Sequence, residues 1–148
     1  EKSDDYKSYE SRNQLLSFYY SFFELLTANR SYVVYALEDN KNNLTKSKSL
    51  KGLKHSFTKY VESLNIPLLE IKQETLDKIQ NTTLKETAWL QFSLTMKYWL
   101  KDTSPSFEKT DIFIEKSVKA SFDLIDTTPL KSIIDFGKFL FKEKIHNK

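Results

Sequence analysis

The sequence predicts an all-α protein, a helical bundle of six or seven helices. Its 148 residues include only two glycines and three prolines, which is too few turn-forming residues for a chain of many short strands. Apolar residues recur at the three- and four-residue spacing of amphipathic helices along most of the chain. A chain of this length buries about 70% of its unfolded surface, so no metal or disulfide is needed to hold it together. We therefore expect residues 1–148 to form a single domain.

Composition excludes several classes of function. Without cysteine, thiolate catalysis and a disulfide framework are excluded, and a reducing, cytoplasmic location is the simpler expectation. Only two of the 23 basic residues are arginine, the residue best suited to phosphate and guanine contacts, so the net charge of +3 is weak evidence for nucleic-acid binding. The longest apolar run, residues 15–26, contains polar residues and falls short of the roughly 20 that a bilayer requires. We expect a soluble chain that does not act at a membrane.

The first half of the chain predicts three helices. Residues 8–28 form a long helix with one narrow polar strip, so most of its sides must be covered. Ser31 has the character of an N-cap for a short helix over residues 31–38. A polar loop over 39–44 then leads to an amphipathic helix over 47–64.

The middle of the chain predicts a weaker helix and then a central one. Pro67 interrupts the pattern, and a helix over 68–79 follows it. Thr83 and Glu86 have the spacing of a capping box, which predicts that a separate helix starts there and runs to about residue 100. This helix is aromatic on most sides, and we expect it to lie at the centre of the bundle.

The last two predicted helices share one start signal. Ser104-Pro105 and Thr128-Pro129 each place a hydroxyl cap before a proline at the first helical position, where no amide hydrogen is missed. They predict helices over 105–125 and 129–145.

The predicted helix over 105–125 carries two apolar stripes. The first, which has the spacing of a core face, consists of Phe107, Ile114, Val118, Phe122 and Ile125. The second consists of Phe113, Ala120 and Leu124, with Ser117 between the two stripes. The small residues Ser117, Ala120 and Ser121 would allow another helix to approach closely. With these, the second stripe and candidate dimer interface comprises Phe113, Ser117, Ala120, Ser121 and Leu124. Periodicity alone leaves two interpretations open: the second stripe is a dimer interface, or the helix is central in a larger monomeric bundle.

The segment from Tyr98 to Ser117 reads YWLKDTSPSFEKTDIFIEKS. It resembles the C-terminal half of TetR-family transcriptional regulators, in a branch with the pattern W-L-x-D-x-S-P-x-F-x-x-T-D-x-x-I-E-K-S. The stretch over residues 15–33, with LLSFYY and then ANRSY, resembles the same branch. The resemblance implies a domain that binds an effector and forms a homodimer through two C-terminal helices from each subunit. It also implies that a separate N-terminal helix-turn-helix domain reads DNA.

The ends of the chain bear on that implication. The chain begins at Glu1, and its single methionine, Met96, falls inside a helix pattern. We therefore expect a fragment that lacks the DNA-reading domain, and specific DNA binding only through that domain.

Effector residues cannot be transferred from the resemblance, because such domains diverge widely. Clustered aromatic residues with a few hydroxyls would suit an apolar, flat or lipid-like ligand. The alternative is that these rings simply fill the core. The candidate ligand-binding residues are Tyr19, Phe22, Phe23, Tyr35, Phe92, Tyr98 and Trp99.

Catalysis, metals and cofactors find no support in the sequence. His55 and His146 stand in no metal-ligand spacing, and there is no glycine-rich phosphate loop, so we expect neither an enzyme nor a cofactor.

One alternative function is a stand-alone lipid-binding protein. The ubiquinone-biosynthesis protein of TetR fold has a similar pattern of aspartate, serine, phenylalanine and threonine at this helix boundary. In that case residues 129–145 would lie on a membrane surface rather than pack on the bundle.

Overall fold

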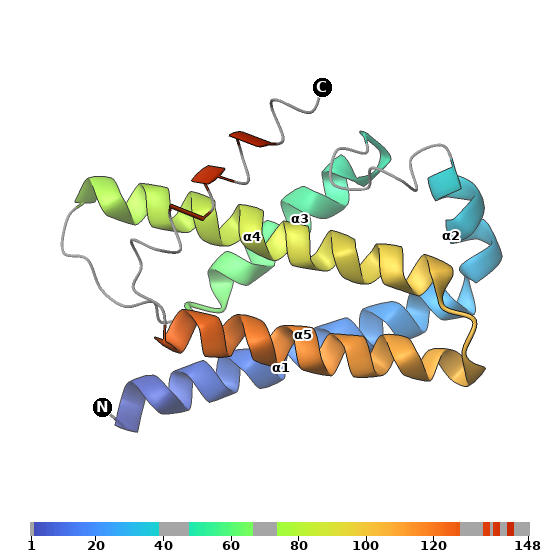
Figure 1. Ribbon diagram of the computed structural model, residues 1–148, viewed down its shortest axis with the longest axis horizontal. Coiled ribbons are helices and arrows are strands. Elements are labelled where there is room, and N and C mark those ends of the chain that lie inside the picture. Colours follow the sequence, from blue (N-terminus) through green and yellow to red (C-terminus); the bar gives the residue numbers. More distant parts are fainter. Residues whose placement is uncertain are drawn as a thin grey trace.

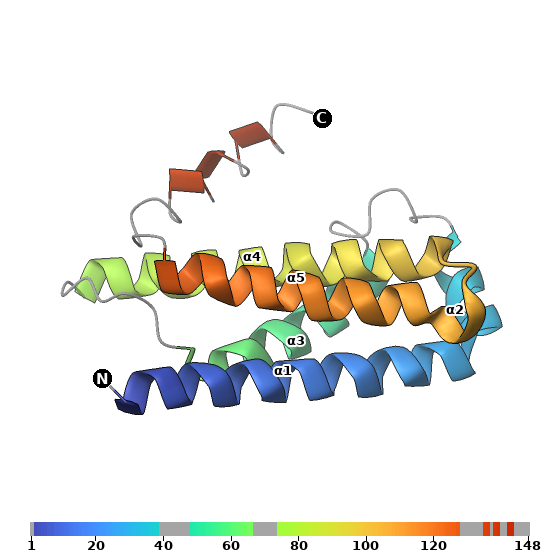
Figure 2. The same cartoon turned by 60° about the horizontal axis from the view of Figure 1, so that its bottom comes forward.

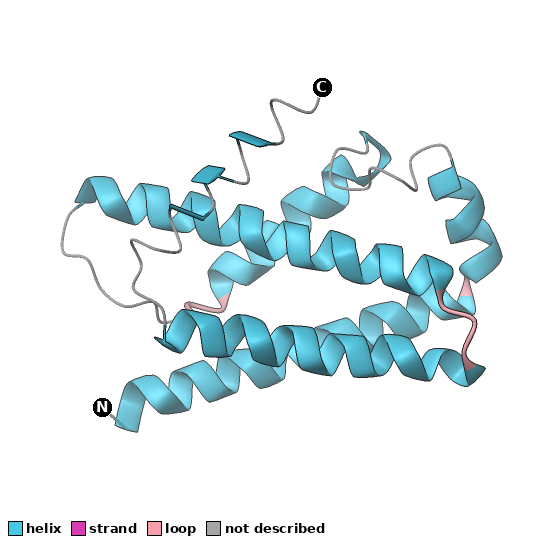
Figure 3. Ribbon diagram, viewed as in Figure 1, coloured by secondary structure: helices cyan, strands magenta, loops and turns pink. Residues whose placement is uncertain are grey.

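The described part of the chain is almost entirely helical, with short turns between the helices. A computed structural model describes the backbone of residues 2–38, 48–66 and 74–127, with short helical pieces at 135–136, 138–139 and 142–143. Side chains are described for 9–38, 48–66 and 84–124 and for those short pieces. Within these residues there are five α-helices and two short 3₁₀ helices and no strand, which confirms the all-α class (Figure 3).

Three long helices lie alongside one another. They are α1 (Lys2–Ala28), α4 (Glu74–Lys101) and α5 (Glu108–Thr127), and α5 returns antiparallel to α4 (Figure 1). The shorter helix α3 (Lys51–Ser63), preceded by the 3₁₀ turn η3 (Lys48–Leu50), crosses obliquely between α1 and α4 (Figure 2). The short helix α2 (Arg30–Leu37) turns back from the end of α1.

The core lies where these helices meet and is unusually rich in rings. Burying each large apolar side chain contributes roughly 1.5 to 3 kcal/mol, so the core is the main source of stability. The predicted core stripe of α5 is confirmed at Ile114, Val118 and Phe122, which are 0 to 3% exposed. Phe107 is half-buried and precedes α5, and the side chain of Ile125 lies outside the described residues. The largest buried side chains of the other helices are Tyr19, Phe23, Phe57, Trp89, Phe92, Met96 and Trp99.

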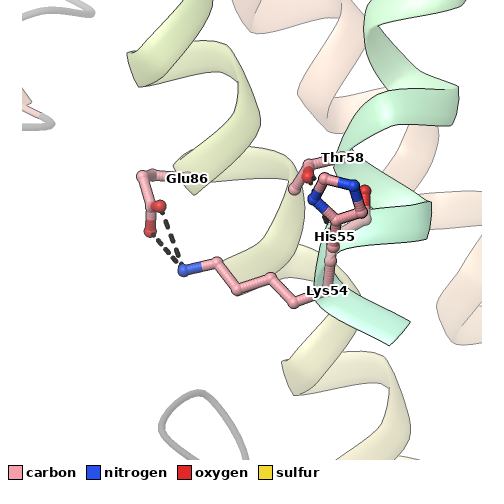
Figure 4. A network of polar contacts seen from close by, with 4 residues as sticks. All are labelled: Lys54, His55, Thr58 and Glu86. Carbon is pink, nitrogen blue, oxygen red and sulfur yellow. Dashed lines mark hydrogen bonds and ion pairs between the residues drawn. The ribbon is translucent and has the colours of Figure 1, made fainter. Parts of the chain in front are cut away.

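The predicted break before the central helix is wrong. Residues 74–79, the described part of the helix expected over 68–79, and the helix expected from Thr83 onwards belong to one continuous helix, α4, so six or seven helices is too many for the described part. No glycine or proline lies between residues 74 and 101, and asparagine and threonine alone do not stop a helix. Glu86, expected to reach back to Thr83, instead pairs with Lys54 of α3 at 3.0 Å (Figure 4). His55, the next residue, is exposed and lies beside this surface pair.

The start of α5 also differs from the prediction. Pro105 opens only a 3₁₀ turn, η4 (Pro105–Phe107), and α5 starts at Glu108. Ser106 and Phe107 have φ angles of 53° and 55°, in the left-handed region, and this interrupts the α-helical backbone.

Two further sequence predictions concern the N-cap of α2 and the segments 39–44 and 129–145. The N-cap position of α2 is Asn29 rather than Ser31, because the Asn29 carbonyl already accepts the amide hydrogen of Val33 at 3.1 Å. The predicted loop over 39–44 and most of the predicted helix over 129–145 lie outside the described residues.

Candidate functional site

Five of the seven candidate ligand-binding residues meet in the core. Phe92 of α4 lies between three rings of α1, with centroid distances of 5.4 Å to Phe22, 5.6 Å to Tyr19 and 5.9 Å to Phe23. Trp99 contacts Phe23 at 6.3 Å. Phe22 is half-buried and the other four are 0 to 3% exposed, so these rings fill the space between α1 and α4. Their role in binding a ligand stays a prediction.

The other two candidates lie elsewhere. Tyr35 projects from α2 and is 77% exposed. Tyr98 is 38% exposed and stacks on Phe113 of α5, with ring centroids 4.6 Å apart and planes within 11° of parallel. Tyr98 therefore belongs to the outer surface of α4 and α5, beside the candidate dimer stripe, and not to the core cluster.

A polar connection crosses the bundle at Gln91, which the sequence analysis did not single out. The Tyr19 hydroxyl donates to Gln91 Oε1, and Gln91 Nε2 donates to Ser117 Oγ at 2.9 Å and to Thr95 Oγ1 at 3.2 Å. Burial raises the pKa of Tyr19 well above its ordinary value of 10, and the hydrogen bond to Gln91 offsets this only in part. Tyr19 is therefore a neutral donor. The connection joins a candidate ligand-binding residue to a candidate interface residue.

Asp102 organises the turn between α4 and α5. Its Oδ1 accepts hydrogen bonds from Ser104 N at 2.8 Å and Ser104 Oγ at 2.6 Å, and its Oδ2 accepts from Thr110 N at 2.9 Å and Thr110 Oγ1 at 2.7 Å. Burial alone would raise the pKa of Asp102, but these hydrogen bonds outweigh it and lower the pKa from 3.8 to about 2. Its carboxylate also faces the first turn of α5, where negative charge is favourable. Ser104 Oγ caps α5 directly, accepting from Lys109 N at 3.1 Å.

Arg30 closes the other side of this turn. Its guanidinium lies 4.5 Å from the Trp99 ring and 4.7 Å from the Phe107 ring. It donates to the carbonyls of Trp99 at 3.1 Å and Leu100 at 3.0 Å at the end of α4, where the Trp99 carbonyl also accepts from Asp102 N at 3.1 Å. Two features of the sequence could have pointed to Arg30: it is one of two arginines in a lysine-rich chain, and it lies in the ANRSY stretch that resembles the TetR branch. Several residues of the Tyr98 to Ser117 segment thus shape the turn between α4 and α5. They include Trp99, Asp102, Phe107 and Thr110.

The candidate dimer stripe lies on the outer side of α5. Leu124 is 52% exposed, Ala120 is exposed, and Phe113 is half-buried. Ser117 and Ser121 are half-buried, and their hydroxyls donate within the helix, to the carbonyls of Ile114 and Ser117. The stripe therefore presents small and apolar groups that no described residue covers completely. Its role as an interface stays a prediction.

Three grooves open on the surface of the described residues. One, of about 630 Å³, lies along α1 and α3. It is lined by Tyr9, Glu10, Asn13, Gln14, Ser17, Phe18, Ser21 and Tyr60. The other two adjoin each other on α4 and α5, with volumes of about 520 and 430 Å³, and share Tyr98, Lys109 and Phe113.

Two features are absent from the described residues. No group of three histidine, aspartate or glutamate side chains comes together there to hold a metal ion. None of the described helices combines the length and the apolar character needed to cross a membrane.

A family model described as the tetracyclin repressor-like, C-terminal domain matches residues 14–140. The chain belongs to this family. TetR-like C-terminal domains are, in general, the ligand-binding and dimerisation parts of regulators, and they typically bind small effectors. Comparison with curated proteins found no significant match, and comparison with solved structures found none. For this TetR-like domain, the effector and the interface must therefore be argued from its own residues.

Proposed function

We propose that this chain is the effector-binding and homodimerisation domain of a TetR-family transcriptional regulator, and that two copies join through the outer stripe of α5. The observation that carries the proposal is the pair of stripes on α5. One stripe is buried in the core of the same chain, with Ile114 and Val118 at most 1% exposed. The other, from Phe113 to Leu124, lies beside it and is exposed at Ala120 and Leu124 and half-buried at Phe113, Ser117 and Ser121.

The small residues of this stripe suit a close helix crossing. Ser117, Ala120 and Ser121 lie within about one turn of one another, and none carries a large side chain. Two α5 helices that cross here can approach closely, since the distance between helix axes depends on the side chains at the contact. Leu94 of α4, 50% exposed, is available to extend the contact into a four-helix arrangement.

The test of the interface is the mass in solution. Light scattering at micromolar concentration is expected to give twice the chain mass of 17.5 kDa. Ala120→Glu places an unpaired charge in the interface and should yield monomers. The control is Ala36→Glu, which adds the same charge at an exposed position of α2 and should remain dimeric. A wild-type monomer at every concentration would refute the proposed interface.

The proposed effector is an apolar or lipid-like molecule that enters between α1 and α4. Support comes from the aromatic cluster around Phe92 and from Phe22, which is half-buried at its edge.

Fluorescence tests this site, because Trp99 contacts Phe23. We expect saturable quenching of tryptophan fluorescence by a planar aromatic compound, weakened by Phe22→Ala. Quenching that never saturates, or that Phe22→Ala leaves unchanged, would argue against a ligand site in this cluster.

A further inference from the structure

A groove on α4 and α5 combines an apolar floor with unpaired positive charge. We call it the lysine groove, and it comprises the two adjoining concavities that share Tyr98, Lys109 and Phe113. Its floor is the stacked pair Tyr98 and Phe113, whose ring centroids are 4.6 Å apart. Leu94 and Ile112 add apolar surface and are 50% and 49% exposed. Its lysines are Lys97, Lys101, Lys109 and Lys116.

These four lysines are not neutralised by neighbouring carboxylates, unlike three other lysines of the described residues. Lys54, Lys85 and Lys119 each have a carboxylate oxygen within 3.0 Å. None of the four groove lysines forms an ion pair with any residue in the described ranges. The one acidic residue that lines the groove is Asp102, and both its oxygens accept hydrogen bonds from Ser104 and Thr110. The groove therefore carries positive charge that its own lining does not neutralise.

Two carboxylates of α5, Asp111 and Glu115, lie toward α1. The pKa of Tyr20 on α1 is raised by burial and then by the charges of Glu115 and Asp111. The pKa of Asp111 is itself raised, by burial first and then by Asp102 and Glu24. An anion in the groove would therefore meet four lysines and, among the residues that line it, the single carboxylate of Asp102.

We propose that the lysine groove binds a free anionic amphiphile, whose carboxylate or phosphate is held by the lysines while its apolar body covers Tyr98, Phe113 and their neighbours. Concavities of about 520 and 430 Å³ are within the usual range for small-molecule sites. The charge complementarity favours an anionic head, and the exposed rings favour an apolar body.

A second copy of the chain is a poorer occupant. A symmetric contact through the groove would bring the same four unpaired lysines from each copy together, and like charges repel. The groove adjoins the proposed interface, because it shares Phe113 and Ser117 with the outer stripe of α5 and Leu94 with the proposed extension of that contact. Its Lys109 lies 11 residues from Ala120, about 16 Å along a helix. Binding of an amphiphile goes beyond the proposed function and does not require the dimer.

Calorimetric titration of the whole chain tests the proposal. The probes are laurate and dodecyl phosphate below their critical micelle concentrations, with dodecyl maltoside as an uncharged head on an alkyl chain of similar length. We expect saturable binding of the two anions, falling as salt is added, and much weaker binding of the maltoside.

Matched variants separate the groove from general charge effects. Lys101→Gln with Lys109→Gln is expected to weaken laurate binding roughly fivefold to tenfold. The control, Lys51→Gln with Lys59→Gln, removes equal charge from exposed positions of α3. It should change the affinity for laurate by less than about twofold. Leu94→Gln should weaken binding of either anion.

Three outcomes would overturn the proposal: equal binding of laurate and maltoside, equal effects of the two double variants, or binding only to phosphatidylglycerol vesicles. The last would indicate a membrane surface as the partner. Light scattering on the same samples keeps the proposals distinct. A dimer that does not bind laurate would contradict the proposed groove and leave the proposed interface standing. A monomer that binds laurate would contradict the proposed interface and leave the groove standing.

Discussion

At the scale of single residues, Asp102 is the side chain on which the α4–α5 turn depends most. One carboxylate accepts four hydrogen bonds, two from Ser104 and two from Thr110. It also fixes where α5 begins, because Thr110 lies in the first turn of that helix. Asparagine keeps the shape of the side chain but loses its charge and one acceptor oxygen, so the effect of the carboxylate can be isolated.

We expect Asp102→Asn to lower the free energy of unfolding by about 2 kcal/mol at pH 7. The pKa of Asp102 is lowered from 3.8 to about 2, so its contribution is complete above the unfolded pKa and is lost as the pH falls through the folded value. The difference between wild type and variant in urea unfolding should therefore shrink between about pH 4 and pH 2.

The matched control for Asp102 is Glu108→Gln, which removes an exposed carboxylate from the same end of α5. It should change the free energy of unfolding by about 0.5 kcal/mol or less. A difference between wild type and Asp102→Asn that stays constant from pH 7 to pH 2 would contradict the proposed role of the charge.

At the scale of elements, apolar periodicity predicted the buried face of a helix better than capping signals predicted where a helix begins. Apolar spacing identified the buried face of α5, because burial of Ile114 and Val118 depends on a repeat that extends over the whole helix. A capping box rests on two residues only, and the pattern at Thr83 is overridden within α4. Contacts with α3, including Lys85 with Glu62 at 3.0 Å, hold this part of α4 in place. The sequence does not reveal such contacts.

In the candidate site, too, residues on the core face of a helix could be predicted from the sequence, whereas contacts between distant segments could not. Tyr19, Phe92 and Trp99 come together because each lies on the core face of its helix, which a sequence pattern can indicate. The contacts of Arg30 with Trp99 and Leu100 join residues 69 and 70 positions apart, and no local pattern encodes them. Exposure of Tyr35 likewise depends on how α2 is placed against the rest of the bundle.

At the scale of the whole molecule, Gln91 joins three helices. It accepts from Tyr19 of α1, belongs to α4, and donates to Ser117 of α5. A half-buried amide with these partners stabilises the bundle only while both are present, since a buried group left without a partner costs about 1 to 3 kcal/mol. It is also the described polar route from the aromatic core to the outer stripe of α5.

A double-mutant cycle tests whether the connection acts as a unit. We expect Tyr19→Phe and Gln91→Leu each to lower the free energy of unfolding by about 1 to 2 kcal/mol, because each leaves the other group unpaired. The double variant should lose about 1 kcal/mol less than the sum, since neither orphaned group remains. Tyr60→Phe is the control for the loss of a hydroxyl, because Tyr60 donates to the Gln14 carbonyl at 3.3 Å near the surface and should matter by about 0.5 kcal/mol or less. Strictly additive losses of unfolding free energy, measured in urea, would show that Tyr19 and Gln91 contribute independently. The hydrogen bonds through Gln91 would then not couple the aromatic core to the outer stripe of α5.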